Sequence, residues 1–155
     1  QWQYYRRRPT AEARTADLNE AVREAAQALD GPRSEQVRLE LAPGALPVRG
    51  TPADLNRLCA FVLLNAAAVN PPGATITVQT GKEPDKVRLR VQDGGPALAP
   101  EHLAELFDPH PVRRAGTSGL ELAACKAIVR RLQGKISAEN GSDGGVSVTV
   151  ELPSA

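Results

Sequence analysis

Apolar residues in the first half of the chain recur at helical spacing in two places. Asp17 fits the N-cap of a capping box, and the apolar stripe that follows it continues to Leu29. Gly31-Pro32 is then expected to end this helix. Thr51 precedes a proline and an acidic residue, which is typical of a helix start. The apolar residues after it continue to about Val69 and cover most sides, so we expect a second, largely buried helix.

Alternation of apolar and polar residues predicts the strands. Residues 37–41 alternate as a half-buried strand should. Residues 75–78 and 87–91 also alternate and are joined by a short turn, which predicts an antiparallel hairpin. Residues 135–139 and 146–152 predict a second hairpin by the same pattern. We therefore expect five strands, most of them antiparallel.

Two more helices are expected in the second half of the chain. A short helix should begin at Pro100 and end near Phe107, and a long one should run from Ser118 to Gly134. This order of elements predicts an α+β fold: a two-layer α/β sandwich whose mixed, mainly antiparallel sheet is covered by helices on one face. We expect a single domain over residues 17–155.

Composition and charge exclude several classes of protein. The chain has 155 residues and a net charge of +1, so it lacks the positive charge typical of nucleic-acid binding. No apolar run reaches the roughly 20 residues of a membrane-spanning helix, and no secretory signal pattern is visible. Cys59 and Cys125 lie in apolar helical patterns. We expect them to be buried free thiols, which fits a reducing compartment.

Two polar residues stand out as candidates for binding. Asp93-Gly94-Gly95 follows a predicted strand directly, and a carboxylate there suits the amine or amide edge of a ligand. The alternative is an ordinary Asp-Gly turn. Asn65 lies on an otherwise apolar helix face, where it would either bond to backbone or serve as an oxygen ligand to Mg²⁺ that carries phosphates.

The segment from Gly116 to Leu122 contains a contradiction. Its small residues open a long helix with a turn that can present backbone N–H groups to a phosphate. Glu121, however, places a carboxylate in the first helical turn, where it opposes a phosphate. Ser118 and Glu121 also fit a capping box, so this helix can satisfy its own N-terminal donors.

Several motifs in one order carry a family resemblance. They are Leu63-Leu-Asn65-Ala66 before Pro-Pro-Gly, Val91-Gln-Asp93-Gly-Gly95, Phe107-Asp-Pro109 and Gly116-Thr-Ser-Gly119-Leu-Glu-Leu. With them the chain resembles the catalytic, ATP-binding domain of bacterial sensor histidine kinases, a branch of the gyrase-like and chaperone-like ATPases with a Bergerat fold. The resemblance covers about Asp17 to Pro153.

The resemblance implies roles for particular residues. Asn65 matches the family residue that binds Mg²⁺ on ATP, and Asp93 the carboxylate that receives the adenine amino group. Gly95 matches the first required glycine of the same glycine box. The remaining cofactor-binding positions are the box position Ala97, the residue Phe107 before the ATP lid, and Gly116, Thr117, Gly119 and Leu120 at the phosphate end. Residues 110–117 would form a short lid.

The chain also departs from the family pattern. In the family, the residue at the position of Phe61 is usually polar. The residues at Ala68 and Val69 are often basic and aromatic or histidine, respectively. Alanine 97 and Glu121 replace glycines of the two glycine boxes. Ser147 takes a place often held by threonine in the nucleotide pocket. The carboxylate for adenine is thus kept, whereas several phosphate contacts are lost.

The resemblance implies ATP and Mg²⁺ as cofactors and phosphotransfer to a histidine outside this chain. Residues 1–16 would be the end of a dimerisation helix and a linker. The implied partners are a phosphoacceptor domain, a response regulator and a second copy of the full-length protein. The implied location is cytoplasmic, either for the whole protein or for the cytoplasmic part of a membrane-bound sensor. The alternatives are a degenerate pseudokinase domain that acts through protein contacts and, less favoured, an anti-sigma-factor serine kinase.

Overall fold

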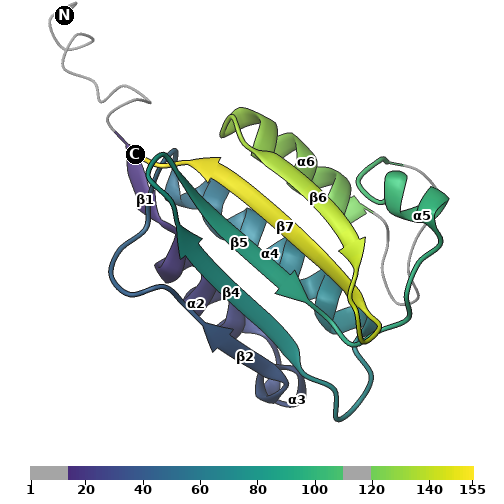
Figure 1. The fold of residues 1–155 in the computed structure, drawn as a ribbon. Coiled ribbons are helices and arrows are strands. Elements are labelled where there is room, and N and C mark those ends of the chain that lie inside the picture. Colours follow the sequence, from purple (N-terminus) through teal and green to yellow (C-terminus); the bar gives the residue numbers. More distant parts are fainter. Residues whose placement is uncertain (1–13, 110–119) are drawn as a thin grey trace, which may run out of the picture.

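A five-stranded sheet covered by helices on one face forms the body of the protein (Figure 1). The computed structural model describes residues 14–109 and 120–155. The strands follow the order β2-β4-β5-β7-β6. β2 runs parallel to β4, and every other neighbouring pair is antiparallel. Their bounds are β2 Val37–Glu40, β4 Ile76–Lys82, β5 Lys86–Gln92, β6 Lys135–Asn140 and β7 Val146–Pro153. The predicted fold class is confirmed.

Three helices cover the apolar face of the sheet. They are α2 (Leu18–Ala28), α4 (Pro52–Val69) and α6 (Leu120–Arg131), and α4 contacts both of the others. The Thr51 side chain caps α4 by accepting a hydrogen bond from the Asp54 N–H at 3.1 Å, as its sequence predicts. Two short helices, α3 (Gly31–Glu35) and α5 (Pro100–Ala104), complete the fold. Within the described ranges, no helix has the length and apolarity needed to cross a bilayer.

A second, two-stranded sheet was not predicted from the sequence. β1 (Thr15–Asp17) pairs antiparallel with β3 (Pro47–Arg49), and Val48 also bridges to Ser154 near the C-terminus. Both strands are only three residues long, too short to show a clear alternation. Because Thr15 and Ala16 belong to β1, the folded unit begins before Asp17, the expected boundary.

The structure differs from the sequence expectations at two helix ends and at two apolar side chains. Gly31-Pro32 does not simply end a helix, because it opens α3 behind an N-cap at Asp30. Leu39 is 39% exposed, since β2 is an edge strand, and Leu64 is 40% exposed on the outer side of α4. Pro100 begins α5 as expected, but this helix ends at Ala104 rather than near Phe107.

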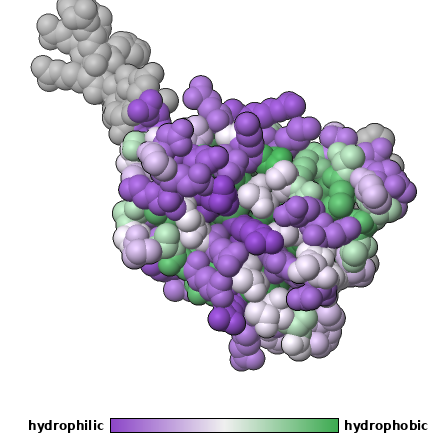
Figure 2. Space-filling model, viewed as in Figure 1, coloured by the Kyte–Doolittle hydropathy of each residue, from purple (hydrophilic) through white to green (hydrophobic). Residues whose placement is uncertain are grey.

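The two faces of the sheet differ sharply in polarity. Residues of β5 that point to the helices, such as Leu89, are buried, while Arg88 and Arg90 point the other way. Arg88 pairs there with Glu151 at 3.0 Å. Figure 2 shows this open side as a mostly hydrophilic surface. The alternation of β5 and β7 therefore assigns one face to the core and the other to solvent.

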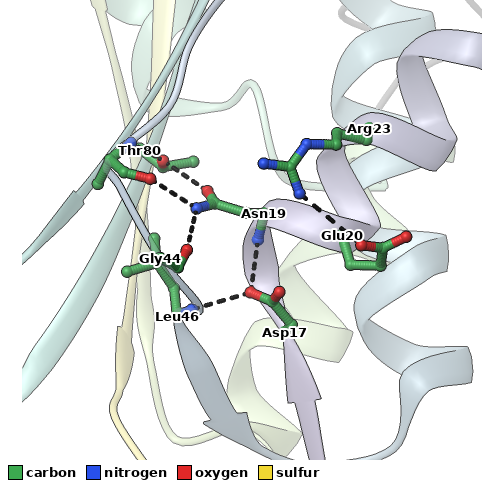
Figure 3. A network of polar contacts seen from close by, with 8 residues as sticks. Asp17, Asn19, Glu20, Arg23, Gly44, Leu46 and Thr80 are labelled. Carbon is green, nitrogen blue, oxygen red and sulfur yellow. Dashed lines mark hydrogen bonds and ion pairs between the residues drawn. The ribbon is translucent and has the colours of Figure 1, made fainter.

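A buried asparagine joins three separate segments at the start of α2 (Figure 3). Asn19 is fully buried, and its amide donates to the carbonyl oxygens of Ala42 at 2.8 Å and Gly44 at 2.9 Å. Its oxygen accepts from the Thr80 hydroxyl at 2.7 Å. Asp17, the predicted N-cap, accepts from the N–H groups of Asn19 and Leu46. Asn19 thus supplies hydrogen bonds to two backbone carbonyls in the loop between β2 and β3.

The two cysteines lie in the interface between α4 and α6. Cys59 and Cys125 are fully buried and form no disulfide, as expected from the sequence. Burial, with a smaller contribution from Cys125 for Cys59 and from Glu121 for Cys125, raises the pKa of each thiol to about 12. The thiols are therefore protonated at neutral pH and pack as small apolar side chains.

Asn19→Ala should lower the free energy of unfolding by about 2 to 3 kcal/mol, because it leaves buried polar groups without partners. Denaturant unfolding followed by circular dichroism measures this change. Gln27→Ala, on the exposed side of the same helix, is the matched control and should shift stability by less than about 0.5 kcal/mol. Equal effects of the two substitutions would contradict the role assigned to Asn19.

Candidate functional site

The candidate site lies where the C-terminal end of α4 meets the loop after β5. Asn65 is on α4, one helical turn before Val69. The loop approaches that turn closely, because a Cβ built on Gly95 would lie 2.8 Å from the Val69 carbonyl oxygen. The fold thus brings together the regions of Asn65 and Asp93, which are 28 positions apart in the sequence.

Asn65 is a buried amide without a protein partner in the described part of the chain. Its exposed fraction is 4%. The side chain makes no hydrogen bond to any residue in the ranges 14–109 and 120–155, whereas Asn19 uses its whole amide. Buried amides in folded proteins are nearly always bonded. Asn65 is therefore the clearest candidate for a group that binds a ligand.

Asp93 is anchored on the last pairing of β5 with β7. Its backbone N–H donates to the Val146 carbonyl at 3.1 Å, one step beyond the registered pair Gln92 and Ser147. Its Oδ1 accepts from the N–H of Gly95 at 2.9 Å and of Val146 at 3.2 Å. The side chain is 4% exposed. One carboxylate oxygen is thus committed to the backbone, which fixes the orientation of the whole group.

Two asparagines hold the loop that follows Asp93. The Asn70 Oδ1 accepts from the Gly94 N–H at 2.7 Å, while its Nδ2 donates to the Ala74 carbonyl at 2.9 Å. At the other end, the Asn140 amide donates to the Leu98 carbonyl at 2.8 Å and accepts from the Leu98 N–H at 2.9 Å. Sequence reasoning missed both residues. Asn70 directly after a helix and before two prolines was the one available signal.

Other predicted positions are placed less directly. Ala97 is exposed in the same loop. Phe107 is 9% exposed and packs in the hydrophobic core. Leu120 is the first residue of α6. Gly116, Thr117 and Gly119 lie outside the described residues, as do the expected lid and residues 1–13.

The surface around Asn65 is apolar where the family pattern is often polar. Phe61, Ala68 and Val69 are partly exposed on α4. None of these side chains can neutralise a phosphate. Glu121 adds a negative charge in the first turn of α6. The described residues therefore supply a carboxylate and an amide to the site, but no positive charge on this part of α4.

The placement of Ser147 in the pocket is wrong. Val146 and Val148 belong to the core on the helical side of β7, so Ser147 between them points to the opposite face. There it accepts a hydrogen bond from the Arg90 side chain at 2.7 Å. Strand alternation therefore directs the Ser147 side chain to the face of the sheet opposite the helices. Val146 is the residue of β7 that contacts the candidate site, through its backbone hydrogen bonds with Asp93.

Metal binding by protein side chains alone has no support in the described residues. Within 14–109 and 120–155, no three residues among His, Cys, Asp and Glu are grouped so that they could hold a metal ion. Any Mg²⁺ at Asn65 would therefore depend on oxygen atoms of a ligand.

The chain matches a family model over two thirds of its length. The model is described as "Histidine kinase-, DNA gyrase B-, and HSP90-like ATPase" and matches residues 50–155. The signal transduction histidine-protein kinase BaeS of Escherichia coli is 33% identical over 117 residues, which are 72% of this chain and 25% of BaeS. The chain thus spans about a quarter of the length of this curated relative.

Solved structures of sensor histidine kinases share the fold. The mycobacterial sensor histidine kinase MprB superposes with a TM-score of 0.81 at 25% identity, covering 91% of this chain and 97% of that one. The histidine kinase domain of the E. coli osmosensor EnvZ superposes with a TM-score of 0.71 at 31% identity, covering 95% and 91%. The similarity therefore includes the whole α/β sandwich and not only the matched motifs.

Gly145→Ala should destabilise the protein by about 2 to 4 kcal/mol. The backbone φ of Gly145 is 75°, and a Cβ there would overlap the Asp93 carbonyl. Its neighbour Gly144 has a φ of 93° but no atom within 4 Å of a built Cβ, so Gly144→Ala should lose only about 1 to 2 kcal/mol. Urea unfolding of both variants measures the difference, and equal losses would contradict the close approach.

Proposed function

Because the chain belongs to the family of histidine kinase-, DNA gyrase B- and HSP90-like ATPases, we propose that it is the catalytic, ATP-binding domain of a sensor histidine kinase. The whole protein would transfer the γ-phosphoryl group of ATP to a histidine on a dimerisation domain outside this chain. Its further partners would be a response regulator and a second copy of the full-length protein. The domain would work in the cytoplasm.

The buried, unbonded amide of Asn65 is the observation that carries this proposal. The residue as a whole is 4% exposed and its amide bonds to no described residue, yet the amide is not among the fully buried unpartnered polar atoms. The amide is therefore open to a ligand at the surface of the site. Its oxygen suits Mg²⁺, a hard cation that prefers oxygen ligands and commonly keeps contacts to phosphates. Asn65 therefore fits a Mg²⁺–nucleotide complex better than it fits a purely structural role.

Asp93 would recognise the base. Hydrogen bonds from Gly95 and Val146 hold its Oδ1, so the direction of the carboxylate is set before any ligand arrives. A carboxylate that is fixed in this way selects a ligand edge with an amino donor, such as that of adenine. Gly95 would allow close approach, and Ala97 would border the same loop.

The proposed site offers fewer contacts to the phosphates of ATP than to its base. MgATP would supply the phosphoryl group, but Phe61, Ala68 and Val69 provide no charge for it on α4. The loss of one charged contact weakens binding by about 1.5 to 3 kcal/mol, or roughly ten- to 150-fold. The second candidate function, a pseudokinase domain that acts through protein contacts, rests on these substitutions.

Calorimetric titration of the 155-residue chain with ATP and Mg²⁺ tests the proposal. We expect saturable binding with a Kd below about 100 μM and no binding above background for Asp93→Asn. The asparagine can keep an oxygen acceptor for Gly95 and Val146, but it replaces the other carboxylate oxygen with an amino donor. That donor repels the adenine amino group.

Asp85→Asn, at an exposed position in the turn between β4 and β5, is the control and should bind like the unmodified chain. Asn65→Ala should abolish the Mg²⁺ dependence of binding. The absence of thermal stabilisation at millimolar MgATP would refute ATP binding and favour the pseudokinase function.

Glu121→Gly should raise ATP affinity by about three- to tenfold, because it removes a negative charge from the first turn of α6. Glu121→Gln removes the charge but keeps the size of the side chain, and it should give most of the gain in ATP affinity. The gain should shrink as salt is added, since the interaction is electrostatic. Unchanged or weaker binding of both variants would show that the carboxylate does not obstruct the phosphates.

A further inference from the structure

We propose that Asn140, together with Asn70, is a positioning residue that holds the loop from Gly94 to Leu98 in the shape that the nucleotide requires. The inference rests on the proposed ATP-binding function. It assigns a role to two residues outside the implied ligand contacts: Asn70, five positions after Asn65, and Asn140, the last residue of β6. Each residue acts on the loop through its backbone.

The Asn140 side chain pairs with the backbone at the C-terminal end of the loop, in the way that the backbone of a neighbouring strand would. It is the last residue of β6, and its side-chain amide forms both a donated and an accepted hydrogen bond with Leu98, at 2.8 Å and 2.9 Å. Two antiparallel bonds to one residue fix both its position and its rotation. Asn70 fixes the near end through the Gly94 N–H at 2.7 Å.

This loop needs such anchors because its own sequence does little to order it. Gly94 and Gly95 have no side chains and wide backbone freedom, and Ala97 is exposed, so Pro96, with its fixed φ, is the residue of this stretch that restricts the backbone most. A loop with these residues loses much conformational entropy when a ligand orders it. Anchoring both ends before the ligand arrives removes part of that cost and raises affinity.

The anchors also decide what the loop can contact. Three of the four N–H groups in the loop, those of Gly94, Gly95 and Leu98, donate to the side chains of Asn70, Asp93 and Asn140, and Pro96 has none. These groups are therefore turned toward the protein and away from a phosphate. The loop should shape the base side of the site, so its anchors should affect ATP and ADP equally.

The location of Asn140 separates a positioning role from a purely structural one. Asn140 is exposed, and its two bonds lie outside the hydrophobic core. Its loss should leave the free energy of unfolding almost unchanged. Asn70 also ties α4 to Ala74, so its replacement would combine both effects. Asn140 is therefore the sharper test.

We expect Asn140→Ala to weaken the binding of MgATP and of MgADP by the same factor, about three- to tenfold, in calorimetry of the 155-residue chain. The thermal unfolding midpoint should stay within about 2 °C of the unmodified chain. Gln79→Ala is the matched control, because it removes another side-chain amide bond, to Glu40 at 2.8 Å, on the open face of the sheet. It should change neither quantity.

Amide hydrogen exchange without nucleotide separates this inference from the proposed function. The Leu98 N–H should exchange about five- to tenfold faster in Asn140→Ala than in Gln79→Ala. Unchanged exchange, unchanged affinity or a loss for ATP alone would overturn the positioning role. A large fall in the unfolding midpoint would overturn it in favour of a structural role. If the unmodified chain binds no nucleotide, the proposed function fails and the positioning role with it, whatever the exchange result says of the loop.

Discussion

The register between β5 and β7 is the constraint on which the site depends. Pairing Gln92 with Ser147 brings Asp93 beside Val146, so that one backbone step supplies both a carbonyl for the Asp93 N–H and an N–H for its carboxylate. A shift of one residue would turn the core side chains of β7 to solvent, which the sandwich does not tolerate. The free energy gained by burying the core side chains of β7 therefore also fixes the orientation of the Asp93 carboxylate. Gly145 belongs to the same constraint, since only glycine fits against Asp93 there.

The base side and the phosphate side of the candidate site are built from different kinds of contact. The base side rests on backbone geometry: a strand end, glycines and three side chains that bind the loop. The proposed phosphate side would instead depend on individual side chains at the helix surface, where Phe61, Ala68 and Val69 carry no charge. Substitution of exposed residues such as Ala68 leaves the fold intact, whereas changes at Gly145 or Asp93 would disturb strand pairing. The chain can therefore lose phosphate contacts one at a time while the carboxylate stays in place.

The sequence predicted those features that depend on local periodicity. The strands of the hairpins and the long helices follow from alternation and from caps such as Thr51. Asn65 and Asp93 could be singled out as candidates because a polar residue on an apolar face and a carboxylate at a strand end are visible locally. Asn140 was missed because its partner, Leu98, is 42 positions away and accepts through its backbone, which leaves no residue-type signal. The prediction that Ser147 lies in the nucleotide pocket was wrong, because a motif match does not specify which face of a strand a side chain occupies.

The buried amide of Asn19 shows that the region of family similarity and the unit that folds are not the same. The family model begins at residue 50, yet Thr80, inside the matched region, needs Asn19, and β3 needs β1. α4 would lose the helix that covers one of its sides if α2 were absent. A fragment cut at the start of the match would carry every candidate ligand contact in the described residues and would still lack part of its core. The boundary of an excisable domain here is set by a hydrogen bond and two short strands, not by the residues that define the family.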